Sequence, residues 1–252
     1  MTALRVERDG PVLRVTLAKP ERRNAFDAAL IAELTEAFTD VGDARAVVLA
    51  GDGPSFCAGA DVEWQRSSID LTYDENVEDA TRLLQMLETI NGCPAPVVAR
   101  VHSYALGGGS GLVACVDVAI AAPDAVFGFS EVKLGIIPAV IAPFVLAKIG
   151  SSARRYFTTG ERFDAATALR IGLVDEVADE PDAAVERVVG ELLTSGPAAA
   201  REAKRLVLDL PSRDELPRVA ARMRTSEEGQ DGLRAFLEKR APGWKAASAG
   251  SS

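Results

Sequence analysis

Histidine is almost absent from this sequence, and cysteine is scarce. His102 is the only histidine, so a metal site built on imidazole ligands is not expected. The three cysteines, Cys57, Cys93 and Cys115, are odd in number and form no C-x-x-C spacing. They suit a reducing compartment and a place in the core rather than a disulfide framework. The sequence therefore predicts no metal site and a packing role for the thiols.

A surplus of positive charge and a long apolar run are also missing. The 252 residues carry a formal net charge of −9, and nucleic-acid backbones are bound through clustered lysine and arginine. The apolar, uncharged stretch 134–147 contains two prolines and is too short to span a bilayer. The N-terminal residues show no apolar signal region. These absences predict a cytoplasmic protein with no nucleic-acid partner and no membrane partner.

The glycine-rich segments fall short of the nucleotide-binding patterns. Neither Gly51-x-Gly53 nor Gly107-x-Gly109 completes G-x-G-x-x-G, and the P-loop pattern is absent. The nucleophile elbow G-x-S-x-G fails around Ser110, because a leucine stands in its last position. The only support for a hydrolase that uses Ser110 and His102 is that the two residues are close in sequence, whereas catalytic triads are recognised by geometry.

The order of apolar patterns predicts an α/β domain followed by helices only. A β-hairpin is expected over 4–7 and 12–17, because apolar and polar residues alternate there. Further strands are expected at 46–50, 96–101 and 173–174, a mobile loop at 67–75, and helices at 30–38, 76–90, 139–149, 153–158 and 164–172. The predicted organisation is an α/β core over 1–195, a helical region over 196–244 and a disordered tail over 245–252.

Two segments of small residues each follow a predicted strand. One is FCAGAD at 56–61, and the other is the glycine cluster at 107–109, which runs into an apolar helix. The first N–H groups of a helix have no partner inside it and carry positive character. A developing negative oxygen is held well at such a place. We expect the two backbones to converge on one ligand.

Three motifs in order resemble the enoyl-CoA hydratase/isomerase (crotonase) family: 56–61, ALGGG at 105–109, and SEVKLGIIP at 130–138. The similarity extends over nearly the whole chain, from NAF at 24–26 through TGERF at 159–163 to FLEKR at 236–240. This resemblance implies a spiral of β-β-α units with C-terminal helices that form a homotrimer or a hexamer. It also implies an acyl-CoA thioester as ligand, and no cofactor or metal beyond the coenzyme A of the substrate.

The resemblance also implies roles for individual residues. The backbone N–H groups of Ala60 and Gly108 form an oxyanion hole, and Glu131 is the carboxylate that transfers a proton. Residues expected to bind the substrate, including the phosphates of coenzyme A, are Arg22, Arg23, Ala25, Ala58, Asp61, Val62, Gly111, Phe236 and Lys239.

Gly111 stands where the hydratases with two catalytic glutamates carry the first of them. The segments 62–64, 111–112 and 130–143 look most like bacterial methylglutaconyl-CoA hydratase-like members, in which that carboxylate is likewise replaced. The expected function is therefore an acyl-CoA lyase that hydrates a 2-enoyl-CoA, with a branched or glutaconyl-type acyl group, through a thioester enolate. Two alternatives stay open: a Δ3,Δ2-enoyl-CoA isomerase with Glu131 as sole proton carrier, and a non-catalytic member that binds acyl-CoA.

The missing carboxylate has two explanations at this point. In the first, the attacking water is positioned by another polar residue: Glu63, Tyr104 or one in the segment 73–75. In the second, Gly111 widens the pocket for a larger, branched or carboxylated acyl group.

Overall fold

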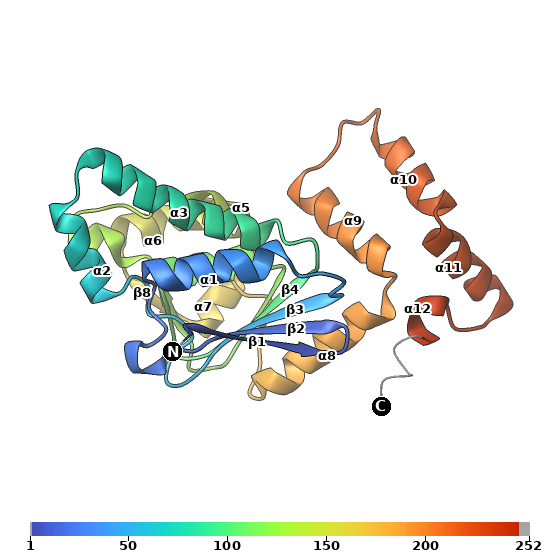
Figure 1. The fold of residues 1–252 in the computed structure, drawn as a ribbon, viewed down its shortest axis with the longest axis horizontal. Helices are drawn as coiled ribbons and strands as arrows, with labels where there is room; N and C mark the ends of the chain where they lie inside the picture. The colour runs from blue at the N-terminus through green and yellow to red at the C-terminus, as the bar shows by residue number, and fades with distance from the viewer. Residues whose placement is uncertain (1, 247–252) are drawn as a thin grey trace.

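The structure is a computed structural model that describes residues 2–246. Its larger sheet has six strands in the order β1-β2-β3-β4-β6-β9 (Figure 1). β1 (Leu4–Asp9) and β2 (Val12–Leu17) form the predicted antiparallel hairpin. The other strands pair in parallel: β3 (Ala46–Gly51), β4 (Val97–Val101), β6 (Val118–Ala121) and β9 (Glu176–Val177).

Both faces of the six-stranded sheet are buried, and this explains its continuous apolar runs. In β3, Val47 and Leu49 join the main core, whereas Ala46 and Val48 join a second core on the other face. Helices α1 (Ala28–Thr39) and α3 (Tyr73–Asn91) lie side by side over the first face (Figure 1). Helix α8 (Pro181–Thr194) covers the second face. The sheet is thus the middle layer of three.

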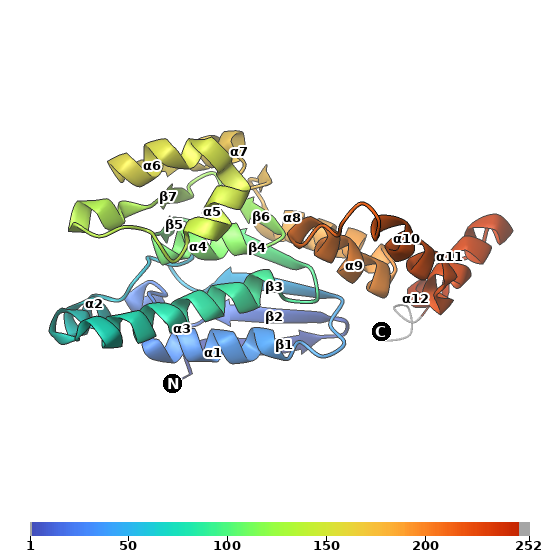
Figure 2. The same cartoon turned by 90° about the horizontal axis from the view of Figure 1, so that it is seen from above.

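A second, smaller sheet lies beside this layered unit, together with most of the central helices (Figure 2). It contains β5 (Tyr104–Leu106), β7 (Val126–Gly128) and β8 (Arg162–Asp164). Its helices are α4 (Gly108–Cys115), α5 (Ala142–Ile149), α6 (Ala153–Thr159) and α7 (Ala165–Ile171). Four 3₁₀ turns connect the elements: η1 (Pro20–Arg22), η2 (Ser68–Asp70), η3 (Ser130–Leu134) and η4 (Gly150–Ser152). The predicted α/β fold class is confirmed.

Three predicted elements differ from the structure. The strand expected at 173–174 is β9 (Glu176–Val177), three residues later, because the N–H groups of Leu173 and Val174 donate to Ala168 O in α7. The expected loop at 67–75 is mostly helical, since it contains the end of α2 (Val62–Ser67), η2 and the start of α3. Thr72 and Glu75 form a capping box there. Helix α5 begins at Ala142 rather than at 139, with a proline in its first turn, where proline is tolerated.

The C-terminal helices extend away from the two sheets (Figures 1 and 2). They are α9 (Pro197–Leu208), α10 (Leu216–Thr225), α11 (Glu227–Glu238) and α12 (Gly243–Ala246). In α9 the buried Lys204 donates to Asp117 Oδ2 at 2.8 Å, which ties this helix to the core. Of the predicted tail, residues 245 and 246 end α12, and the remainder lies outside the described residues. Within 2–246, no helix combines the length and the apolar character needed to cross a membrane.

Candidate active site

The two segments of small residues are joined backbone to backbone. The N–H of Leu106 donates to Cys57 O at 3.0 Å, and the N–H of Phe26 donates to Gly59 O at 2.7 Å. This approach requires glycine: a Cβ on Gly59 would lie 2.8 Å from the carbonyl oxygen of Leu106. A Cβ on Gly109 would lie only 2.3 Å from the carbonyl oxygen of Cys57. The two backbones therefore converge, as the small residues predicted.

Ala60 and Gly108 offer backbone donors at this junction. Throughout residues 2–246, no acceptor is found for either N–H group. Gly108 is the first residue of α4, so its N–H has no partner inside the helix. The N–H of the preceding Gly107 is occupied, because it donates to Gly128 O at 2.8 Å. Two free donors on neighbouring backbones can hold one anionic oxygen.

Glu131 lies against the same glycine cluster. One carboxylate oxygen is 3.2 Å from the position that a Cβ on Gly107 would take. The other oxygen, Oε2, is buried and has no hydrogen-bond partner among the described residues. Burial of the carboxylate raises the pKa of Glu131 above the ordinary glutamate value. The side chain is held on η3, whose turn closes when the N–H of Ile136 donates to Glu131 O at 3.2 Å.

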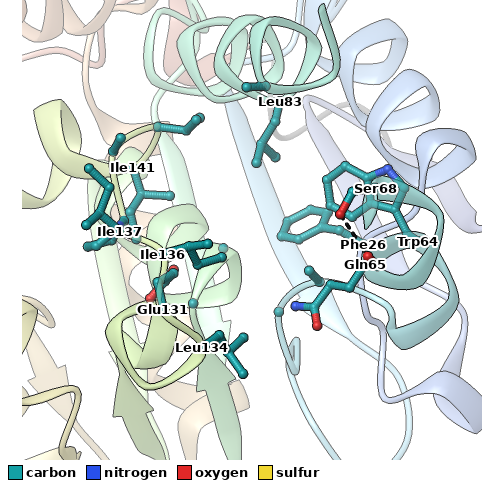
Figure 3. Close-up of a pocket in the computed structure, with 18 of the residues that line it drawn as sticks. Phe26, Trp64, Gln65, Ser68, Leu83, Glu131, Leu134, Ile136, Ile137 and Ile141 are labelled. Atoms are coloured by element: carbon teal, nitrogen blue, oxygen red, sulfur yellow. Dashed lines mark hydrogen bonds between the residues drawn. The ribbon is translucent and has the colours of Figure 1, made fainter. Parts of the chain in front are cut away.

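These groups open into one cavity of about 290 Å³ (Figure 3). Ala58, Gly59, Ala60, Gly107 and Gly108 line it from the converging backbones. The wall that carries Glu131 also presents four apolar side chains, those of Leu134, Ile136, Ile137 and Ile141. The opposite wall contains Phe26, Trp64, Gln65 and Ser68, and Leu83 points in from α3. A buried carboxylate and two free backbone donors therefore share one cavity.

Gly111 does not line this cavity, which is a correction to its predicted role. A Cβ built on Gly111 would lie 2.5 Å from Cγ2 and 3.1 Å from Cβ of Ile141. Ile141 is 3% exposed, so its branched side chain fills the space above the glycine. Gly111 therefore opens no volume of its own to the cavity, because Ile141, which does line the cavity, occupies the space beside the glycine.

Arg22 and Asp61 border a second, open depression that shares Trp64 with the cavity. Asp61 accepts the N–H groups of Glu63 and Trp64 as the N-cap of α2, and Arg22 Nη1 lies 3.0 Å from its Oδ2. Burial alone would raise the pKa of Asp61, but the Glu63 N–H and the Arg22 guanidinium lower it below the usual value. Both charges are engaged with each other, and Asp61 fixes the start of α2.

The remaining predicted binding residues are spread over the molecule. Arg23 and Val62 are exposed, and within residues 2–246 the Arg23 side chain makes no ion pair or hydrogen bond. Ala25 is buried beneath the converging segments. Phe236 is 81% exposed on α11, and Lys239 follows that helix. Because α11 lies at the other end of the molecule from α2 and α3, the structure does not bring Phe236 or Lys239 to the cavity of the same chain (Figure 1).

The wall formed by α2 and α3 was missed in the sequence. Its polar members are Gln65, Ser68, Asn76 and Asp79. The helical spacing of 76, 79, 80 and 83 was a usable signal, because it places these residues on one face of α3. The candidate water-positioning residues Glu63, Tyr104 and 73–75 line no part of the cavity. Glu63 pairs with Arg66, and Tyr104 faces Arg162.

Ser110 and His102 are each occupied elsewhere. The Ser110 hydroxyl is fully buried and donates to Ala105 O at 2.6 Å. His102 Nε2 lies 2.9 Å from Gly53 O, and its Nδ1 faces Arg100. The structure therefore gives no support to a serine hydrolase at these residues.

Comparison with known proteins agrees with this geometry. The family model for enoyl-CoA hydratase/isomerase matches residues 7–247. A putative enoyl-CoA hydratase of Thermus thermophilus is 32% identical over 246 residues, covering 92% of this chain and 97% of that protein. The cyclohexa-1,5-dienecarbonyl-CoA hydratase of Thauera aromatica is 32% identical over 262 residues, covering 95% of each.

Solved structures extend the similarity to the fold. Pseudomonas aeruginosa AtuE superposes with a TM-score of 0.91 at 38% identity, covering 96% of this chain and 99% of that one. An enoyl-CoA hydratase from Shewanella pealeana gives 0.90 at 37% identity, covering 96% of each chain. The prediction of a hydratase-class enzyme is thus confirmed at the level of the family, although the methylglutaconyl-CoA subtype is not. The chain belongs to the enoyl-CoA hydratase/isomerase family.

Proposed function

We propose that the protein hydrates the double bond of a 2-enoyl-CoA. The observation that carries this proposal is the joint exposure of Glu131 and the unpaired Ala60 and Gly108 N–H groups to one cavity. Attack on the double bond of an acyl thioester places negative charge on the thioester oxygen, and fixed backbone donors stabilise that charge. Loss of one such donor costs an enzyme about 3–4 kcal/mol of transition-state stabilisation.

The proposed reaction needs one carboxylate and no cofactor beyond the coenzyme A of the substrate. Glu131 takes a proton from water, and the water oxygen bonds to the β-carbon. The double-bond electrons pass to the thioester oxygen, which Ala60 and Gly108 hold as an enolate. When the enolate collapses, the α-carbon takes the proton back from Glu131. The raised pKa of Glu131 suits a group that must both accept and return a proton near neutral pH.

The coenzyme A of the substrate is proposed to extend from the cavity over the depression beside Trp64. Arg22 and Arg23 lie on that side of the chain, and the exposed Arg23 is available for a phosphate. Measuring the salt dependence of CoA binding to Arg23→Gln tests this placement. An unchanged affinity at low salt would remove Arg23 from the proposal.

The proposed assembly is a homotrimer or a hexamer formed through the helices of 196–244. These helices leave large apolar side chains in solvent, and the residues concerned include Val207, Leu210, Leu233, Phe236 and Leu237. Several large apolar side chains exposed on neighbouring helices support an interface there. Light scattering on the full chain measures the mass of the assembly, and a monomer at micromolar concentration would contradict the proposed homotrimer or hexamer.

Replacing Glu131 with glutamine tests the activity itself. With crotonyl-CoA as substrate and enoyl absorbance as readout, Glu131→Gln should lose turnover by on the order of a hundredfold to ten-thousandfold while still binding CoA esters. Glu186→Gln is the matched control, because Glu186 on α8 pairs with Arg14 apart from both the cavity and the depression, and its loss should leave turnover unchanged.

Three results would change the proposal. If a 3-enoyl-CoA becomes conjugated while crotonyl-CoA is untouched, the protein is an isomerase that uses Glu131 as its only proton carrier. If neither the wild type nor Glu131→Gln turns over an enoyl-CoA and both bind CoA esters equally, the protein binds acyl-CoA without catalysis. If both glutamate variants lose activity equally, the loss reflects general damage rather than the chemistry of Glu131.

A further inference from the structure

The charged residues that line the cavity are all acidic. Among the lining residues, only Glu131 and Asp79 carry a side-chain charge, and no lysine, arginine or histidine takes part. Asp79 is held from outside by Arg82, whose Nη1 lies 3.5 Å from its Oδ1 and which does not line the cavity. A carboxylate on a bound acyl group would therefore meet two like charges and no cationic partner among the described lining residues. Burial of an unpaired carboxylate is strongly unfavourable.

The wall around Glu131 is made of hydrocarbon. Leu134, Ile136 and Ile137 come from η3 and the segment after it, and Ile137 is 71% exposed although it lines the cavity. In Figure 3 these side chains stand across the open space from Trp64 and Phe26. Large apolar side chains left exposed at a concave site are stabilised when an apolar ligand covers them.

The space next to Gly111 adds to the same wall. A polar or charged substrate group cannot enter there, because Ile141 packs onto the glycine with its branched Cβ and Cγ2 atoms. The position at which the family resemblance implies a second carboxylate is therefore closed by an aliphatic side chain. Substrate selection falls to the exposed wall, residues 134–137.

We infer that this cavity selects uncharged, apolar acyl groups over carboxylated acyl groups of the same shape. The inference rests on the proposed function and narrows it: a branched hydrocarbon acyl group fits, and a glutaconyl-type group does not. The wall formed by 134–137 is the specificity-determining element, and Ile137, its most exposed member, is where the charge of the wall can be changed with least disturbance.

A pair of substrates isolates the effect of charge. Glutaconyl-CoA is compared with a neutral analogue in which an isopropyl group replaces the terminal carboxylate, so that shape is retained. We expect the neutral substrate to have a kcat/KM higher by on the order of a hundredfold, as is typical when a site offers a buried charge no partner. Equal kcat/KM values for the two substrates would overturn the inference.

A pair of variants then tests the wall itself. Ile137→Lys adds a cation at an exposed position, and Ile137→Met is the matched apolar control. The lysine variant should raise the ratio of glutaconyl to neutral kcat/KM at least about tenfold by supplying a partner for the carboxylate, whereas methionine should leave it unchanged. If lysine does not move the ratio, or if methionine moves it equally, the wall is not the specificity-determining element.

Equilibrium binding separates this inference from the proposed function. The saturated CoA thioesters of the two acyl groups cannot be hydrated, and their dissociation constants report selection without turnover. Weaker binding of the carboxylated ester supports the inference even if no enoyl-CoA is hydrated, in which case the proposed function alone fails. Equal binding, together with hydration of crotonyl-CoA, leaves the proposed function intact and overturns the inference.

Discussion

Gly111→Ala tests the contact between Gly111 and Ile141. A helix-interior glycine costs about 0.5–1 kcal/mol relative to alanine, so alanine in open space should stabilise the fold. At Gly111 the added Cβ meets Cγ2 of Ile141 at 2.5 Å, where ordinary carbon contacts are about 3.5–4.0 Å. Overpacking of this kind costs about 1–3 kcal/mol, which outweighs the gain in helix propensity. We therefore expect Gly111→Ala to lower the free energy of unfolding.

Gly190→Ala is the matched control. Gly190 is an exposed residue inside α8, and nothing lies within 4 Å of its built Cβ. At this position the substitution changes only the helix propensity, so the free energy of unfolding of the variant should exceed that of the wild type by up to about 1 kcal/mol. The opposite signs at two helical glycines distinguish the packing contact from a general effect of alanine.

The assay is urea unfolding of the four proteins of a double-mutant cycle, with Ile141→Ala as the second change. Ile141→Ala alone should cost about 2–5 kcal/mol, because it leaves a cavity in a buried site. In that background Gly111→Ala loses its clash with Cγ2 and fills part of the cavity, so its effect should become neutral or stabilising. The coupling energy should be about 1–3 kcal/mol. Additivity of the two changes within about 0.5 kcal/mol would refute the packing described for Gly111 and Ile141.

Two further predictions concern charges inside the fold. Burial raises the pKa of Glu131, so the stability from its protonated form is complete below the ordinary glutamate value of about 4.3 and is lost as pH rises through the raised pKa. Glu131→Gln should therefore gain stability over the wild type at neutral pH in urea unfolding and lose that advantage in acid, whereas a gap that stays constant with pH would contradict the raised pKa. Lys204→Met removes the cation that pairs with Asp117 and leaves that carboxylate only the Val97 N–H, at a site where the lysine side chain is 5% exposed. It should cost about 3–5 kcal/mol and expose α9 to proteases. Unchanged proteolysis at the start of α9 would show that this ion pair does not hold the helix to the core.

The fold was largely predictable, because its apolar patterns have a direct physical cause. The run at 46–50 is apolar without alternation since both faces of β3 are buried. The polar residues of the hairpin are concentrated in β1, which is mostly exposed because it forms the edge of the sheet. The strand predicted at 173–174 was misplaced because Leu173 and Val174 are buried, and a buried residue need not form hydrogen bonds with a neighbouring strand. The helical start of α3 was missed although Thr72 and Glu75 have the spacing of a capping box.

The candidate site was predictable only in part. General physics pointed from the strand-end small residues to the segments 56–61 and 107–109, whereas Ala60, Gly108 and Glu131 were singled out only by the family resemblance. The packing of Ile141 against Gly111 could not be predicted, because the two residues are distant in sequence and no periodic pattern links them. Likewise, helical spacing predicts a face on α3 without telling which cavity that face borders.

The pairing of the two small-residue segments has a consequence for how this protein tolerates change. The separation of the Ala60 and Gly108 N–H groups is set by main-chain hydrogen bonds, those of Phe26 to Gly59 and Leu106 to Cys57. The cavity walls, by contrast, are side chains on η3, the segment after it, α2 and α3. Single substitutions can therefore change the cavity walls while the backbone that carries the two N–H donors stays fixed. Proteins built on this scaffold can therefore change their acyl preference while they keep the two backbone donors that we propose stabilise an enolate.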